Sequence, residues 1–173
     1  MPSTVKILET ERLIIRQLSV DDAPFIFGLV NEPSWLRFIG DKKVRTIDDA
    51  RNYILKGPIE SYERNGFGLY LVELKETGDA LGICGLIKRE TLNDVDIGFA
   101  FLPKFWGKGY AIEAGAAVIE LGKNTFGLRR IVAITSPDNH SSIKVLERLG
   151  MKFEGLIRLA GNEPEIKFFA LDA

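Results

Sequence analysis

The chain has 173 residues, enough for one domain with its own core, and its net charge of −1 gives no reason to expect nucleic acid or an anionic membrane as a partner. Its 46% hydrophobic and 27% charged residues are typical of a soluble globular protein, and no apolar run approaches the ~18 residues of a membrane span. One cysteine and one histidine exclude a Cys/His zinc site, and the N-terminus lacks a basic-then-apolar leader. We therefore expect a single domain over residues 1–173, a cytoplasmic location and no metal.

The first half of the chain predicts two strand–helix transitions and a hairpin. A strand over 13–18 is followed by an N-cap signal at Ser19 and a helix through 23–30, which residues 31–34 with Pro33 break. Thr46 is a second N-cap signal, for a helix to about residue 63 that Pro58 kinks or divides. Residues 69–74 and 81–88 read as a hairpin, and Cys84 within it is expected in the core.

The second half predicts alternating strands and helices. A strand over 95–101, a helix over 109–122 and a strand over 130–135 form one βαβ unit, which should be parallel. A helix over 142–149 and a final hairpin, 153–159 with 166–171, complete the chain. The other strand neighbours are expected to be antiparallel. The predicted fold class is therefore α/β, or α+β, with a mixed sheet and helices on both faces.

Two glycines one residue apart, Gly107 and Gly109, lie between the strand 95–101 and the helix that follows. The first turn of a helix has free backbone N–H groups and a positive dipole end, and glycine lets a phosphate approach them closely. A Walker A loop is excluded because Gly109 follows Lys108, and a dinucleotide fingerprint because position 112 is Ile112. A cofactor bearing a pyrophosphate is the first hypothesis, and an ordinary glycine turn is the alternative.

The chain resembles the GNAT superfamily of acyl-CoA-dependent N-acetyltransferases in four segments. They are 9–16, 97–103, 106–114 and 139–150, and their order and spacing match the family. Within it, the chain resembles the group that contains the ribosomal-protein N-terminal (alanine or serine) acetyltransferases. The resemblance covers nearly the whole chain. It implies a central sheet with splayed parallel strands, acetyl-CoA (coenzyme A) as co-substrate, and an amine acceptor that is a protein N-terminus or a small molecule.

The resemblance also implies how coenzyme A is held. Backbone N–H groups of the glycine loop would hold its pyrophosphate, and the pantetheine arm would pair with the exposed strand, where Gly98 could mark a bulge. Lys104 and Lys108 either contact phosphate or are solvated surface lysines, and Asn139 either binds the arm or is a turn residue. The implied CoA-binding residues are Phe99, Ala100, Phe101, Leu102, Lys104, Gly107, Lys108, Gly109, Tyr110, Ala111, Asn139 and Ser142.

Acetyl transfer requires a neutral, aligned amine and a donor for the developing oxyanion, which the resemblance places at the backbone N–H of Phe99 or Ala100. Asp96 stands where relatives often carry Glu, and it could take the amine's proton through water or be a partly exposed strand residue. Glu113 is a weaker candidate, because an acid in the first helical turn is favoured by the dipole alone.

The leaving sulfur needs a proton or a hydrogen bond. Much of the superfamily uses a Tyr, but the matching residue here is Leu146, which cannot donate. The resemblance then assigns this role to Ser142, whose alternative role is a helix cap in competition with Ser141. Ser142 and Asp96 are the candidate catalytic residues.

The acceptor site is less determined. The candidate walls are Trp35, Arg37, Phe38 and Tyr70, although residues of this kind most often pack in the core or at its rim. The competing hypothesis is a non-catalytic acyl-CoA-binding or sensing domain, because the Tyr is missing and the side chain of Asp96 is shorter than the Glu of relatives. A structural domain without ligand is a third hypothesis. A homodimer is compatible with the resemblance, but no feature of the sequence requires one.

Overall fold

The computed structural model describes residues 5–172 and holds one eight-stranded mixed sheet, in the order β1-β2-β3-β4-β5-β6-β8-β7. Residues 1–4, part of the stretch on which the absence of a leader was judged, lie outside the described residues. The strands are β1 (Lys6–Glu9), β2 (Leu13–Gln17), β3 (Leu69–Leu74), β4 (Ala80–Ile87), β5 (Asp96–Phe101), β6 (Arg130–Thr135), β7 (Lys152–Ile157) and β8 (Ile166–Asp172).

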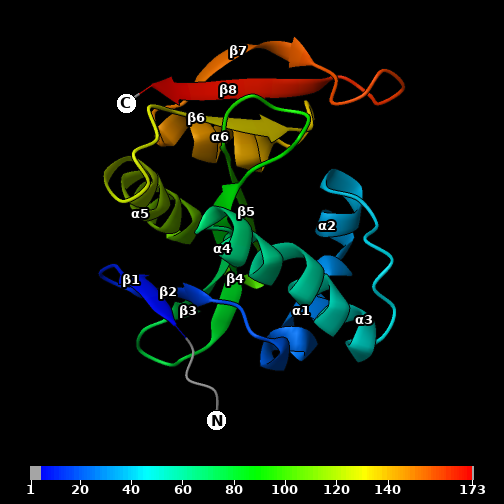
Figure 1. Cartoon of the computed structure of the whole chain (residues 1–173), viewed down its shortest axis with the longest axis vertical. Helices are drawn as coiled ribbons and strands as arrows, with labels where there is room; N and C mark the ends of the chain where they lie inside the picture. The colour runs from blue at the N-terminus through cyan, green and yellow to red at the C-terminus, as the bar shows by residue number, and fades with distance from the viewer. Residues whose placement is uncertain (1–4, 173) are drawn as a thin grey trace.

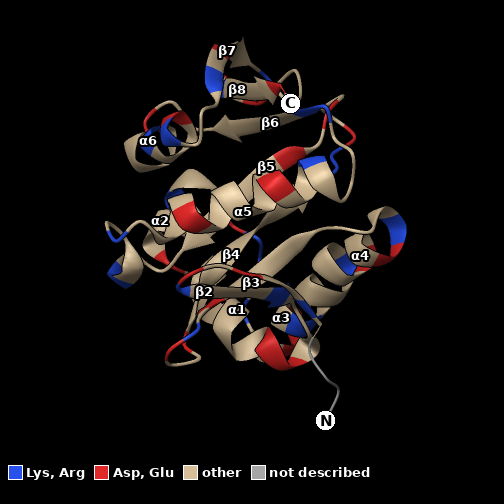
Figure 2. Ribbon diagram, turned by 90° about the vertical axis from the view of Figure 1, so that its left-hand side faces the viewer, with Lys and Arg blue, Asp and Glu red and all other residues tan. Residues whose placement is uncertain are grey.

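Helices cover both faces of this sheet, as Figure 1 shows, with α5 on one side and α1 to α3 on the other. Figure 2 shows α5 lying across the strands. The helices are α1 (Ala23–Val30), α2 (Pro33–Phe38), α3 (Ile47–Ile54), α4 (Glu60–Asn65), α5 (Tyr110–Asn124) and α6 (His140–Arg148), with short 3-10 turns at Val20–Asp22 and Pro103–Phe105. The predicted mixed fold is confirmed.

Alternating side chains of the central strands fill the two cores. Tyr70, Val72 and Cys84 face α5, whereas Leu71 and Ile83 face α1 to α3. This alternation is the period-two pattern of a strand buried on both faces. Burial raises the pKa of the Cys84 thiol to about 12, so it remains an uncharged core side chain.

The one parallel pair of strands separates almost at once. β5 and β6 share a single registered pair, Asp96 with Val132, and Val132 N donates to Val95 O at 3.0 Å. β6 then continues in register with β8, and β5 continues in register with β4. The sheet is therefore open between β5 and β6 on the C-terminal side of Asp96, among the residues that the structure describes.

Three local features differ from the sequence prediction. β1 was not predicted, because four residues at a sheet edge are too few to show a period. The chain break at Pro33 is present, but a second helix, α2, begins there, with Pro33 in its first turn where its missing N–H costs nothing. β4 and β5 also pair without a register shift through Gly98, so the bulge expected there is absent.

The helix predicted to pass Pro58 is in two pieces. α3 begins after the N-cap Thr46, whose side chain accepts from Asp49 N, and a π-helical segment (Leu55–Ile59) joins it to α4. Pro58 lies inside that segment, since its ring cannot fit a regular helix interior. The three segments follow one another without a gap, so Pro58 interrupts the regular helix, in line with the kink or division expected there.

Candidate active site

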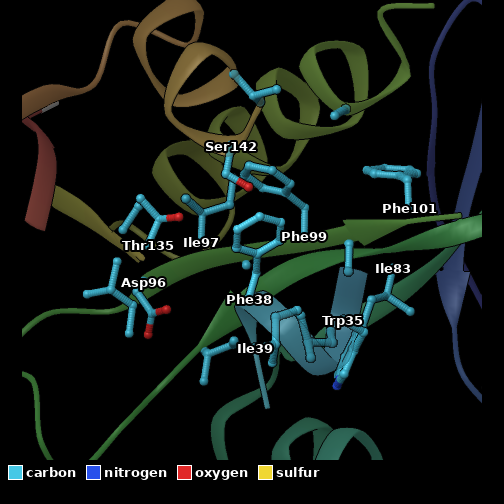
Figure 3. A pocket seen from close by; sticks show the side chains of 18 of the residues that line it. Trp35, Phe38, Ile39, Ile83, Asp96, Ile97, Phe99, Phe101, Thr135 and Ser142 are labelled. Carbon is cyan, nitrogen blue, oxygen red and sulfur yellow. The ribbon is translucent and has the colours of Figure 1, made fainter. Parts of the chain in front are cut away.

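A cavity of about 1120 Å³ passes through the sheet where β5 and β6 part. Single small-molecule sites typically occupy ~300–1,000 Å³, so this volume has room for more than one reactant. The glycine loop and the start of α5 line it on one side, and α2, α3 and the π-helical segment line it on the other. In Figure 3, Phe38 and Phe99 stand between Asp96 and Thr135 at one end and Trp35 and Ile83 at the other.

The glycine loop presents a row of backbone N–H groups. Gly107 and Gly109 have positive φ angles of 75° and 83°, and α5 begins after Gly109 with no side-chain cap. Among the described residues, none of the N–H groups from Gly107 to Ala111 donates a hydrogen bond to the protein. A Cβ added at Gly107 would meet no atom within 4 Å, so the space beside this residue is open. Such an array is suited to an anion.

The turn between β1 and β2 holds this loop from behind. The carboxylate of Glu113 accepts hydrogen bonds from Thr10 Oγ1, from Arg12 N at 2.9 Å and from Arg12 Nε at 2.7 Å. Arg12 Nη1 also donates to Lys108 O at 3.0 Å, and its guanidinium lies 4.4 Å from the centre of the Tyr110 ring. Burial would raise the pKa of Glu113, but these hydrogen bonds together lower it. Glu113 is therefore a structural partner of Arg12.

Alternation along β5 decides which backbone groups face the opening. Leu102 N donates to Leu81 O at 2.9 Å, so residue 102 is hydrogen-bonded to the β4 side. In an antiparallel ladder every second residue is bonded to the same neighbour, and Ala100 is therefore bonded to β4 as well. The N–H groups of Phe99 and Phe101 point the other way, toward β6. Of the two oxyanion donors expected, Phe99 is the one that faces the opening.

One side chain closes part of this edge. Trp106 Nε1 donates to Phe101 O at 2.8 Å, and the indole ring remains 47% exposed beside the glycine loop. The hydrogen bond uses the carbonyl of Phe101 and leaves its N–H directed toward the opening. The backbone of Phe99 lies one pleat deeper in the cavity wall.

Asp96 is fully buried at the cavity wall, which excludes the partly exposed strand residue as its alternative. Burial raises its pKa to about 6, although Arg89 Nε donates to Asp96 Oδ1 at 3.0 Å and opposes this shift. A carboxyl group with this pKa is mostly ionised at neutral pH and still binds a proton readily. The Asp96 carboxyl group is buried, is paired with Arg89 through one oxygen and lines a cavity. These are the properties of a catalytic acid or base.

The start of α6 places Asn139, Ser142 and Leu146 along the cavity. Asn139 is the N-cap, because its Oδ1 accepts from Ser142 N at 3.3 Å. This excludes the alternative role of Ser142 or Ser141 as the helix cap, so the hydroxyl of Ser142 is free of it. Figure 3 shows Ser142 beside Phe99. Leu146 is buried at the position where a donor was missing from the sequence.

The candidate acceptor walls divide into two groups. Trp35, which is 5% exposed, and Phe38 both come from α2 and line the cavity. Ser136 Oγ donates to Phe38 O at 3.3 Å, which holds α2 against the end of β6. Tyr70 lies outside the cavity, on the α5 face of the sheet, where it stacks on Tyr62 with ring centres 5.5 Å apart.

Three residues of the predicted CoA site lie outside the cavity lining. Leu102 packs toward the core under α1 to α3. Lys104 is exposed, with its Nζ 5.2 Å from the centre of the Phe105 ring, and the contact given for Lys108 is its carbonyl oxygen with Arg12. The other predicted CoA-binding residues line the cavity; they are Phe99, Ala100, Phe101, Gly107, Gly109, Tyr110, Ala111, Asn139 and Ser142.

Arg12, Arg89, Lys42 and Tyr53 have no role in the sequence prediction, yet the fold brings each to the cavity or its loop. Arg12 lies in one of the segments that carry the family resemblance, which was a usable signal. Arg89 lies two residues after Ile87, which pairs with Asp96 in the sheet. The positive charge of Arg89 near the negative charge of Asp96 was a second usable signal. Lys42 and Tyr53 lie far away in the sequence and gave no signal.

The described residues fit coenzyme A in two independent ways: unpaired amides at a glycine loop and an open strand edge beside it. The sequence profile of the acetyltransferase (GNAT) domain family matches residues 12–152. The chain belongs to the GNAT acetyltransferase family. Members of this family use acetyl-CoA and act on amine acceptors.

Known GNAT proteins cover the chain almost from end to end. The uncharacterized N-acetyltransferase YoaA of Bacillus subtilis is 30% identical over 154 residues, which span 88% of this chain and 86% of that protein. A GNAT-family acetyltransferase structure from Bacillus anthracis superposes with a TM-score of 0.78 at 28% identity and covers 98% of both chains.

The ribosomal group is present among the structural neighbours. RimL, a ribosomal L7/L12 alpha-N-protein acetyltransferase solved with coenzyme A, superposes with a TM-score of 0.82 at 20% identity and covers 98% of both chains. At this identity the likeness concerns the fold. The predicted membership of the GNAT proteins is confirmed, and the ribosomal group shares the fold of this chain.

Over residues 5–172 no helix combines the length and the apolar character needed to span a membrane. In the same part of the chain, no group of three or more His, Cys, Asp or Glu side chains is arranged to hold a metal ion.

Proposed function

We propose that this GNAT protein transfers the acetyl group of acetyl-CoA to a primary amine, either a protein N-terminus or a small molecule, by direct attack. The single observation that supports this most is the row of unpaired N–H groups from Gly107 to Ala111 beside the parted strands. When bound, acetyl-CoA supplies a thioester that an amine can attack and a thiolate that can leave. The proposal takes residues 1–173 as one acetyltransferase domain.

The loop and the strand edge position the reactants. The N–H groups of Gly107 to Ala111 bind the diphosphate, because they converge at the positive end of α5 without competing protein acceptors. The Nδ2 group of Asn139 remains available for the pantetheine arm, since its Oδ1 is used as the helix cap. Phe99 N–H, directed into the opening, stabilises the negative charge that develops on the carbonyl oxygen.

Two side chains handle the protons. Asp96 accepts a proton from the incoming ammonium through water; its pKa of about 6 compares with ~7.7–8.0 for a protein N-terminus, so the transfer is moderately uphill. The hydroxyl of Ser142, released from capping, donates a hydrogen bond to the departing sulfur. A thiolate with a pKa near ~8.5 needs little more than that.

The test is release of free CoA thiol from acetyl-CoA across a panel of amines, followed by mass spectrometry of amines acetylated by the pure protein in a cell extract. A primary amine whose mass rises by one acetyl group less the hydrogen that it replaces, in step with thiol release, supports the proposal. Tight CoA binding by calorimetry without any turnover would instead indicate the non-catalytic acyl-CoA-binding protein.

A further inference from the structure

One end of the cavity is rich in cations from separate elements. Arg89 follows β4, Lys42 follows α2, and Lys56 lies in the π-helical segment; all three line the cavity together with Tyr53 of α3. Among the described residues, no carboxylate lies within ion-pair distance of Lys42 or Lys56. Arg89 uses its Nε for Asp96, and its two Nη groups have no hydrogen-bond partner in the same part of the chain.

Arg89 lies close enough to Lys42 and Tyr53 for its charge to act on both. Burial lowers the pKa of Lys42, and the charge of Arg89 lowers it further. Burial raises the pKa of Tyr53, and Arg89 opposes that shift. Lys42 and Lys56 are exposed to solvent and Arg89 is half-buried. Positive groups that lie at one end of a cavity and are short of counter-charges are stabilised by an anion placed among them.

The positive charge continues outward to the surface. A second hollow of about 400 Å³ shares Lys42, Tyr53 and Lys56 with the main cavity and adds Lys43. Its acidic residue, Asp49, accepts a hydrogen bond from Arg45 N at 2.9 Å.

The acids at this end are mostly occupied. Glu60 pairs with Arg64, and Asp96 pairs with Arg89. Glu32 is the remaining acid of the main cavity on the α2 side. The cations at this end therefore outnumber the acids left to neutralise them.

We infer that the acceptor is an amine that carries its own anionic group, such as a carboxylate, bound at the cationic end formed by Arg89, Lys42 and Lys56. This inference rests on the proposed function and names its substrate class. Asp96 lies three residues before Phe99 on β5, about 10 Å along an extended strand, so the anion stands several bonds from the reacting nitrogen. Small amino acids of this kind and acidic peptide N-termini share this chemistry.

Matched acceptors test the inference. Peptides beginning Ala-Asp-Asp are compared with Ala-Asn-Asn and Ala-Lys-Lys, and γ-aminobutyrate is compared with its amide, which separates the peptide from the small-molecule source. We expect kcat/KM to be about fivefold or more higher for the carboxylate member of a pair, as for one favourable charge contact, and this preference to shrink with salt. Equal rates, or preference for the lysine peptide, would overturn the inference.

Two variants locate the effect. Lys42→Gln should reduce the preference for the carboxylate acceptor and leave the KM for acetyl-CoA unchanged. Lys152→Gln, on the exposed edge strand β7, removes the same charge outside the cavity and should keep the preference. An equal loss of preference in both variants would mean that overall charge, and not the cavity, is responsible.

A binding experiment separates this inference from the proposed function. N-acetylated forms of the same peptides are titrated by calorimetry into the protein saturated with CoA. Tighter binding of the acidic product without any turnover would support the inference and contradict the proposed activity. Turnover of amines with no preference for the acidic product or acceptor would support the activity and contradict the inference.

Discussion

Arg12 and Glu113, 101 positions apart in the sequence, are joined side chain to side chain at 2.7 Å between Nε and Oε1. Through this pair the turn after β1 holds the glycine loop, since Arg12 also donates to Lys108 O at 3.0 Å. The loop's own amides stay unpaired while its carbonyl side is fixed. This separation of roles lets the loop be rigid and still be available to an anion.

Arg12→Ala should weaken CoA binding by about five- to tenfold, because a charge-assisted hydrogen bond that is partly exposed is worth roughly 1–1.5 kcal/mol. Calorimetry with CoA measures this. Arg45→Ala is the matched control, since Arg45 pairs with Asp41 outside the cavity and should leave the affinity unchanged. Unchanged affinity in Arg12→Ala would show that the loop holds its shape without this brace.

Gly107→Glu should abolish measurable CoA binding, because it places a carboxylate beside the amides that are expected to hold the diphosphate. Gly127 has a similar positive φ, 65° against 75°, and an added Cβ meets no atom within 4 Å at either position. Gly127→Glu therefore carries a similar backbone strain of about 1 kcal/mol but should bind CoA normally. Equal CoA affinity in the two variants would contradict the loop assignment.

The activity should fall as the pH is lowered through about 6, because Asp96 must be ionised to accept a proton. A profile of kcat/KM against pH should show the fall near pH 6 with every amine. The separate fall caused by protonation of the amine should move with the pKa of that amine. Asp96→Asn should lose the fall near pH 6 and most of the rate. A fall that persists near pH 6 in Asp96→Asn would assign it to another group.

Asp96 should also make stability depend on pH. Its folded pKa, about 6, lies above the ordinary value of 3.8, so the folded state binds the proton more tightly than the unfolded state. The free energy of unfolding therefore falls as the pH rises from about 4 to about 6, by as much as ~3 kcal/mol from this group. Asp96→Asn should gain stability relative to the original chain over that interval in urea titrations, and a parallel pair of curves would contradict this.

Ser142→Ala should lower kcat by roughly tenfold and leave the melting temperature nearly unchanged, because Asn139 and not Ser142 caps α6. Ser141→Ala, the exposed neighbour, should change neither quantity. Asn139→Ala should cost about 1 kcal/mol of stability through loss of the cap. A loss of stability in Ser142→Ala as large as in Asn139→Ala would mean that the serine is structural.

The sequence by itself determined the alternation of strands and helices and the location of the glycine loop. These features are local. Apolar runs at 69–74 and 130–135, turn signals at glycines and the interruption of a helix at Pro58 are all set by neighbouring residues. The family resemblance rests on the same local segments, which is why it could be read without the fold.

Tertiary structure alone decided which groups meet in the cavity. The side on which Phe99 N–H points depends on its pairing with β4, and the burial that raises the pKa of Asp96 depends on elements packed around it. Arg12 reaches Glu113, and Lys42 joins Arg89, only because the chain returns from far away in sequence. Tyr70 has an aromatic side chain like Phe38, yet the pleat of β3 turns it into the core under α5 and outside the cavity, and no local pattern fixes that outcome.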